Sequence, residues 1–255
     1  MINNIYTIKF KYDDEFNYTH EETETIKAPT KEAALKQLQK IYDDDEDLEI
    51  LNVTREPNVG LAVIRGQCTH NGHVAMADKM HHEMDVVIIA SGSTQEHSTI
   101  NNPWTPKHRR TMWEKIYGKS GKHSKLKIIE LRDIGAVSKI AWSSHVFGKI
   151  DGLNLPKPTH YYAGSKHDAS WFDSMNEEFG EDTLEIVILD RYKDSICMSG
   201  TEIRKSILDG SDDWKEFVPS VIVDYVEETF PYEAINLYGD VNVEAEKAAF
   251  EKRNR

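Results

Sequence analysis

The stretch "LAVIRGQCTHNGH", residues 61–73, joins an apolar segment to a polar loop and then to a helical pattern. The apolar run 61–64 predicts a short buried strand. From His73 onward, apolar residues recur at helical spacing, which predicts a helix that begins at His73 and buries Val74, Ala77, Met80 and Met84. The stretch therefore predicts a strand, a loop and a helix in direct succession.

The same succession continues along the chain. Further apolar runs predict strands at 85–90, 126–131, 160–164 and 184–189. Helical patterns separate them at 106–117, 138–150 and 169–179. Alternating strands and helices predict an α/β fold with a Rossmann-like, doubly wound parallel sheet. Such a sheet binds ligands beyond the carboxyl ends of its strands.

The first 56 residues follow a different pattern. Period-two alternation in "IYTIKFKY" predicts a strand, and "TETIK" and "LEILNVT" predict two more, with a helix capped by Thr30 before the last. This ββαβ order carries no ligand motif, which favours a packing or oligomerisation module. We therefore expect an accessory domain at 1–56, a main domain at 59–232 after the linker "EPNVG", and a charged tail at 233–255.

Composition restricts the partners. The 255 residues carry a net charge of -13, which disfavours nucleic acid because its phosphates would be repelled. No secretory signal and no apolar run long enough to span a membrane occurs, and there are two cysteines. These features predict a cytoplasmic protein without a membrane partner, whereas phosphorylated small molecules stay possible where cations cluster locally.

The loop 65–73 contains such a cluster. Backbone N–H groups at the start of a helix attract anions, and Gly72 permits close approach of the backbone. His70 and His73 can donate to phosphate oxygens, and Arg65 adds a fixed charge. Two histidines three apart without a further ligand make a poor zinc site. The alternative is a turn with incidental histidines, and His81 and His82 further along the helix are expected to be solvated.

A second candidate lies at "SGTEIR", residues 199–204. Ser199, Gly200 and Thr201 open a predicted helix, so hydroxyls and unpaired backbone N–H groups converge there. Arg204 falls one turn later on the same side of that helix. The alternative is an ordinary N-cap with a surface arginine, but two such junctions in one chain favour a shared phosphate ligand.

The two stretches resemble the H-x-G-H and I-S-x-T-x-x-R signatures of the nucleotidyltransferase superfamily. More narrowly, residues 60–232 resemble the archaeal-type nicotinamide mononucleotide (NMN) adenylyltransferases. The first stretch matches at Arg65, Gln67, His70, Gly72 and His73 and departs at Ile64, Gly66 and Cys68. A loop at 92–105 and a stretch at 190–204, "DRYKDSICMSGTEIR", carry further matches. No Nudix box, found in fused members of the family, occurs.

The resemblance implies an enzyme of NAD biosynthesis that joins ATP and NMN to give NAD and pyrophosphate. It implies catalytic roles for His70, His73 and Arg204. ATP-binding roles fall on Arg65, Gln67, Gly72, Ser199, Gly200 and Thr201. Acceptor-binding roles fall on Gln95, Asn101, Arg109, Asp133 and Trp142, of which Trp142 would stack on the nicotinamide ring and Asn101 replaces a common arginine.

The same interpretation expects Mg²⁺ that is bound by substrate rather than by a protein metal site, and a homo-oligomer. Two alternatives stay open. The chain could transfer a nucleotide to another phosphorylated acceptor, such as phosphopantetheine, FMN or a phosphosugar. It could also be a regulator that binds NAD or ATP without turnover.

Overall fold

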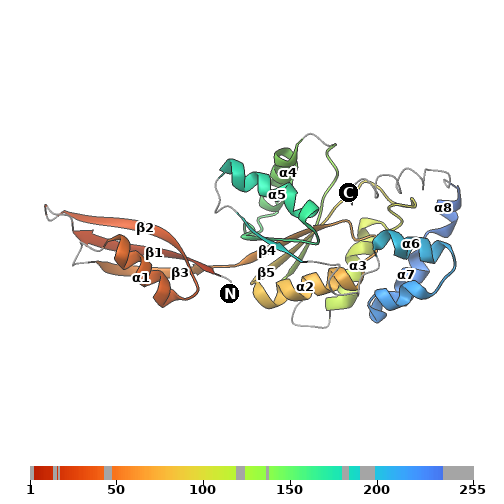
Figure 1. Ribbon diagram of the computed structural model, residues 1–255, viewed down its shortest axis with the longest axis horizontal. Helices are drawn as coiled ribbons and strands as arrows, with labels where there is room; N and C mark the ends of the chain where they lie inside the picture. The colour runs from red at the N-terminus through yellow and green to blue at the C-terminus, as the bar shows by residue number, and fades with distance from the viewer. Residues whose placement is uncertain are drawn as a thin grey trace.

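A computed structural model describes residues 3–13, 16, 18–42, 48–118, 124–135, 138–179, 184–189 and 199–237. These residues form two separate sheets, one of three strands and one of five. Figure 1 shows the small sheet and the C-terminal helices α6 to α8 at opposite ends of the long axis, with the five-stranded sheet between them.

The small sheet is antiparallel in the order β2-β1-β3, built from β1 (Asn4–Asp13), β2 (Thr19–Ala28) and β3 (Glu49–Glu56). Helix α1 (Lys31–Ile41) covers one face, and the Thr30 side chain caps it by accepting from the Ala33 N–H. The alternating residues Tyr6, Ile8 and Phe10 face this helix and form the core of the unit. The predicted ββαβ order and the predicted cap are both confirmed.

The main sheet is entirely parallel, with the order β6-β5-β4-β7-β8. Its strands are β4 (Val59–Ile64), β5 (Val86–Ser91), β6 (Leu126–Glu130), β7 (His160–Ala163) and β8 (Glu185–Ile188). The order reverses beside β4, because β5 and β6 lie on one side of it and β7 and β8 on the other. The predicted doubly wound fold is confirmed, and its ligand crevice is expected where β4 and β7 end.

Helices cover both faces of this sheet (Figure 1). On one face, α4 (Lys139–Asp151) and α5 (Lys166–Phe179) pack on Leu61 and the other strand residues that share its side. On the opposite face, α2 (Asn71–Glu83) and α3 (Pro106–Tyr117) pack on Ala62 and its neighbours. Since successive residues of a strand point to opposite faces, each strand contributes to both clusters.

A third cluster forms beyond the carboxyl ends of the strands. It joins α6 (Gly200–Leu208), α7 (Val223–Thr229), α8 (Tyr232–Leu237) and the 3-10 turns at Asp213–Phe217 and Ser220–Ile222 to the loops of the sheet. Trp104 is fully buried there, and its indole N–H donates to Thr229 Oγ1 at 3.1 Å. This packing holds α6 against the loop that follows β4.

The small unit is attached at the opposite end of the main sheet, where the strands begin. Arg55 forms two hydrogen bonds with the Asp85 carboxylate, at 2.9 and 2.8 Å, immediately before β5 begins. The Asn58 N–H donates to the same carboxylate at 2.8 Å. The amino ends of the strands therefore carry the small unit, and the expected ligand crevice lies at the opposite, carboxyl ends.

Three local expectations were wrong. The first strand of the main sheet begins at Val59, so the linker is shorter than predicted. Helix α2 begins at Asn71 with His70 as its N-cap, two residues before the predicted start. His81 is not solvated but 5% exposed, because its ring packs 4.9 Å from that of Tyr117 on α3, whereas His82 is exposed as expected. In the described part of the chain, every helix is too short or too polar to cross a membrane.

Candidate active site

The two histidines of the loop after β4 lie together at the start of α2. Their rings stack with centroids 3.7 Å apart and an angle of 21° between planes. The His70 N–H points to His73 Nδ1 at 3.5 Å, which fixes the orientation of the second ring. Because His70 is the N-cap of α2, both imidazoles sit at the positive end of the helix dipole, where an anion is favoured.

Arg204 connects this loop to the second motif. Its Nη1 donates to the Gln67 carbonyl oxygen at 2.6 Å, and its Nη2 donates to Thr201 Oγ1 at 3.1 Å. Gly200 fits closely against the same carbonyl, since a Cβ at this position would lie only 2.9 Å from the Gln67 oxygen. The structure therefore brings together two motifs that are far apart in the sequence, since Gln67 and Arg204 are separated by 137 residues.

The N-terminus of α6 faces this junction. Ser199 is the N-cap, and its hydroxyl accepts from the Glu202 N–H at 3.2 Å. The Glu202 carboxylate in turn accepts from the Ser199 N–H at 2.7 Å and from its hydroxyl at 2.6 Å. This capping box shows that the end of the helix already favours negatively charged oxygen atoms.

Arg109 lies beneath the loop and is 1% exposed. Its Nη1 donates to the carbonyl oxygens of Arg65 at 2.6 Å and of Gly92 at 2.7 Å, which ties together the loops after β4 and β5. Burial lowers the pKa of its guanidinium to about 10, so the group stays charged at neutral pH. The geometry fits a positioning role beneath the loop after β4, whereas the resemblance assigned Arg109 to the acceptor.

Gln67 is also buried, and its side-chain amide is occupied within the protein. Its Nε2 donates to the Trp104 carbonyl at 3.0 Å, and its Oε1 accepts from the Trp104 N–H at 2.9 Å. The side chain thus fixes the loop, while its carbonyl receives Arg204. Cys68 beside it is fully buried, and burial raises the pKa of its thiol to about 12, which argues against a nucleophilic role.

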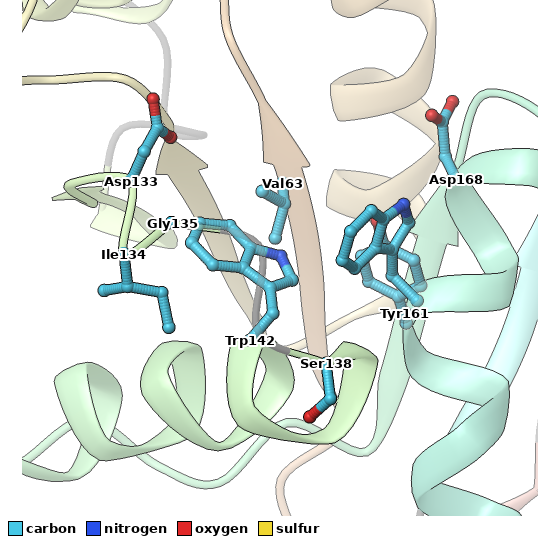
Figure 2. Close-up of a pocket in the computed structure, with 9 residues that line it drawn as sticks. Val63, Asp133, Ile134, Gly135, Ser138, Trp142, Tyr161 and Asp168 are labelled. Atoms are coloured by element: carbon cyan, nitrogen blue, oxygen red, sulfur yellow. The ribbon is translucent and has the colours of Figure 1, made fainter.

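A pocket of about 340 Å³ opens at the end of β4, on the face of the sheet covered by α4 and α5. Asp133 and Trp142, two predicted acceptor residues, line it (Figure 2). Gln95 is held at its edge, because its Nε2 donates to Asp133 Oδ2 at 2.8 Å and its Oε1 accepts from the Asp133 N–H at 3.0 Å. Val63, which lines the pocket, precedes Arg65 by two residues, so the loop after β4 begins close to the pocket.

Several lining residues did not emerge from the sequence. They come from β4, from the segment after β6 and from β7 and α5, and comprise Val63, Ile134, Gly135, Ser138, Tyr161 and Trp171. Asp168, which also lines the pocket, belongs to the stretch 163–169, where the resemblance to the superfamily implies acceptor contacts. The spacing of Asp168 and Trp171 places both on one side of α5, but an amphipathic helix gives the same pattern. Asn101 lies in the loop between β5 and α3. Residues 190–198, which belong to the stretch that resembles the family, lie outside the described residues.

The site combines a loop rich in cations, a helix N-terminus and an aromatic pocket at the switch point of the sheet. In the described residues, no group of three or more His, Cys, Asp or Glu side chains could hold a metal ion. Such an arrangement can bind a polyphosphate and place a second phosphorylated molecule beside it. These features agree with the resemblance to the nucleotidyltransferases.

Solved structures of the same fold are known. A bifunctional NMN adenylyltransferase/ADP ribose pyrophosphatase from Francisella tularensis superposes with a TM-score of 0.56 at 18% identity. The match covers 77% of this chain, which spans only 57% of that larger protein. A second structure of the Francisella protein, in complex with AMP and a manganese ion, superposes with a TM-score of 0.54 at 18% identity, covering 78% of this chain and 55% of that one.

Sequence comparison defines the family. The nicotinamide-nucleotide adenylyltransferase of Methanococcus vannielii is 32% identical over 164 residues, which are 64% of this chain and 85% of that protein. The enzyme of Thermococcus onnurineus is 28% identical over 181 residues, covering 71% of this chain and 88% of that protein. No family model matches the sequence. The chain belongs to the nicotinamide-nucleotide adenylyltransferase family, enzymes that make NAD by adenylyl transfer.

Proposed function

We propose that the cation-rich loop and the N-terminus of α6 together hold the triphosphate of ATP, and that the neighbouring pocket holds NMN. The observation that carries this assignment is the hydrogen bond from Arg204 to the Gln67 carbonyl, which makes the two motifs one surface. Either motif alone could be an ordinary helix start. Joined at the switch point of the sheet, they form a site long enough for several phosphate groups.

In the proposed reaction, a phosphate oxygen of NMN attacks the α-phosphorus of ATP. A new P–O bond forms to the acceptor, the bond between the α-phosphorus and the bridging oxygen breaks, and pyrophosphate leaves with the electron pair. No side chain needs to become a covalent nucleophile, because the acceptor phosphate already is one. Catalysis then depends on alignment of the two substrates and on stabilisation of the charge that shifts onto pyrophosphate.

We assign the histidines and arginines to this stabilisation. His70 and His73 donate to phosphate oxygens from the start of α2, and the exposed Arg65 reaches the same loop from β4. Gly72 and the backbone N–H groups of α2 allow close approach of a phosphate. Ser199, Gly200 and Thr201 receive the far end of the triphosphate, and Arg204 keeps them in register with the loop.

We further propose that a magnesium ion enters the site with ATP. The described residues around the loop offer imidazoles, guanidinium groups and hydroxyls rather than a cage of carboxylates. This donor set fits Mg²⁺ bound by phosphate oxygens and water, which is its usual mode in nucleotide enzymes. When bound, the ion would supply positive charge to the phosphates and so lower the cost of pyrophosphate departure.

The pocket provides the acceptor contacts. Trp142 presents an indole beside Val63 (Figure 2), and a cationic pyridinium ring over an indole gains about 1 kcal/mol or more when desolvated. Gln95 and Asp133 hold each other at the rim, and Asn101 lies in the loop that leads away from it. Residues 59–232 then contain all proposed substrate contacts.

We propose that residues 1–56 serve assembly rather than catalysis. The unit is attached at the amino ends of the strands of the main sheet, whereas the proposed site lies at their carboxyl ends. Its edge strand β3 carries Ile50 and Leu51, which are 39% and 37% exposed. An exposed edge strand with apolar side chains is a common surface for self-association, which fits a homo-oligomer.

The test is turnover by the purified chain with ATP, Mg²⁺ and a panel of phosphorylated acceptors, with the product identified by mass. We expect NAD and pyrophosphate from NMN. His73→Ala should lower kcat by roughly 10²-fold or more, since it removes a donor that acts as charge develops. His82→Ala, an exposed residue on the same helix, is the matched control.

A second variant separates the roles of the two substrates. Arg204→Lys keeps a charge but loses the fork that contacts both Gln67 and Thr201. We expect a higher KM for ATP and an almost unchanged KM for NMN. Product from another acceptor but not from NMN, or binding of ATP with no pyrophosphate release, would overturn the proposal in favour of one of the two alternatives.

A further inference from the structure

Glu202 engages hydrogen-bond donors at the N-terminus of α6 that the proposed triphosphate site also needs. Its Oε2 accepts from the Ser199 N–H at 2.7 Å and from the Ser199 hydroxyl at 2.6 Å. The same hydroxyl accepts from the Glu202 N–H at 3.2 Å. Both donors of Ser199 are thus held by one carboxylate, so a phosphate oxygen can reach them only if this carboxylate moves away.

The neighbouring Thr201 is arranged differently. Its hydroxyl accepts from Arg204 Nη2 at 3.1 Å, and a hydroxyl that accepts in this way can still donate its hydrogen. The N–H groups of Gly200 and Thr201 belong to the first turn, where they have no partner within the helix. The end of α6 therefore offers donors to a phosphate beside Arg204, while the Glu202 carboxylate holds the donors of Ser199.

The Glu202 carboxylate is exposed and keeps its negative charge. In the described part of the chain, no lysine, arginine or histidine forms an ion pair with it. The start of a helix favours an anion, but two anions that meet there repel each other. Because the carboxylate is attached to α6 itself, it returns to Ser199 at a high effective concentration once another anion leaves.

We propose that Glu202 competes with the departing pyrophosphate for the N-terminus of α6 and thereby promotes its release. This inference rests on the proposed function, which places the far end of the triphosphate on Ser199, Gly200 and Thr201. ATP displaces the Glu202 carboxylate from Ser199 when it binds, and the carboxylate returns when pyrophosphate leaves. The competition lowers the affinity for ATP as well, but it prevents the product from occupying the site.

Glu202→Gln in the full chain separates the charge from the helix cap. Glutamine keeps an oxygen that can accept from the Ser199 N–H, and it is a usual residue at this position of a capping box, so the fold should be retained. We expect the inhibition constant of pyrophosphate against ATP to fall about tenfold, because a like charge a few ångströms away is removed. Calorimetry with pyrophosphate, with and without Mg²⁺, should show the same gain in affinity, and the gain should shrink as salt is added.

Glu32→Gln is the matched control, since it removes an exposed carboxylate from the first turn of α1 in the small unit. Its affinity for pyrophosphate should equal that of the unsubstituted chain. If Glu202→Gln binds pyrophosphate no more tightly than the control, the inference is wrong. Weaker binding in the presence of Mg²⁺ would also overturn it, because Glu202 would then help to hold the metal rather than oppose the phosphate.

Two further readouts separate competition by charge from its alternatives. A gain in affinity that does not depend on salt would come from the new amide donor of glutamine and would contradict the inference. A raised KM for ATP in Arg204→Lys, together with unchanged pyrophosphate binding in Glu202→Gln, would overturn only the role of Glu202. No change in either variant would overturn the proposed phosphate site itself.

Discussion

Replacement of Gly200 by alanine tests whether close contact between the two phosphate-binding motifs sets the activity. A Cβ at this position would lie 2.9 Å from the Gln67 carbonyl oxygen and 3.4 Å from Arg204 Nη1. The first distance is several tenths of an ångström shorter than van der Waals contact. Because the obstructing atom belongs to the backbone, α6 or the loop must move to relieve the contact.

The size of the effect follows from two opposing terms. Overpacking a closely fitted site costs about 1–3 kcal/mol, while alanine regains at most about 1 kcal/mol of helix propensity over glycine. The net loss of about 1–2 kcal/mol should lower Tm by roughly 3–6 °C in a domain of this size. A displacement of about 0.5 Å between the motifs should lower kcat about tenfold, if 1 Å costs about 10²-fold.

Gly148→Ala is the matched control. Gly148 lies inside α4, and a Cβ built on it meets nothing within 4 Å. The same substitution there gains helix propensity without a steric penalty, so Tm should rise slightly and turnover should not change. Thermal unfolding and steady-state pyrophosphate release measure both effects. A Gly200→Ala protein that is as stable and as active as Gly148→Ala would refute the idea that this contact aligns the site.

Two further outcomes are expected. A chain shortened to begin at Pro57 should keep its kcat when it is compared with the full chain at equal folded concentration. The truncation removes the Arg55–Asp85 pair, which is exposed and contributes little to stability, so any loss of activity should follow a change in molar mass or Tm. A folded short chain with unchanged assembly and no activity would contradict this prediction. The pH dependence of unfolding should include a contribution from His160, whose pKa is lowered by burial despite the nearby Glu185. The folded state then binds fewer protons than the unfolded state, so the free energy of unfolding should fall as the pH drops below about 6.5. Urea titrations should show a smaller fall for His160→Asn and no change for His82→Asn.

Most of the fold could be predicted because strands and helices of the main domain have clear apolar patterns. The start of α2 could not, because histidine is not among the usual N-cap residues, and the pattern alone favoured a later start. The burial of His81 depends on the ring of Tyr117, which reaches it from another helix. A helical pattern records which side of a helix is apolar, but not which polar residue a neighbouring helix covers.

The site was predictable where its chemistry lies in contiguous motifs and not where it depends on packing. His70, His73 and Arg204 stand in recognisable stretches, and the structure places these stretches together. Trp171, which lines the pocket, belongs to a helix whose sequence looks like that of any surface helix. The hydrogen bonds between the Gln67 side chain and the Trp104 backbone could not be predicted either, because the sequence does not show which backbone segment a loop amide will contact.

The placement of Arg109 puts a buried positive charge beneath the loop after β4, in a chain with a net charge of -13. Its hydrogen bonds go to two carbonyl oxygens, and in the described part of the chain no carboxylate forms an ion pair with it. Carbonyl groups orient a guanidinium without cancelling its net charge. A buried charge is also screened less by salt than an exposed one. The Arg109 charge therefore adds to the positive potential of Arg65 in the same loop, and it acts locally against the negative charge of the rest of the surface.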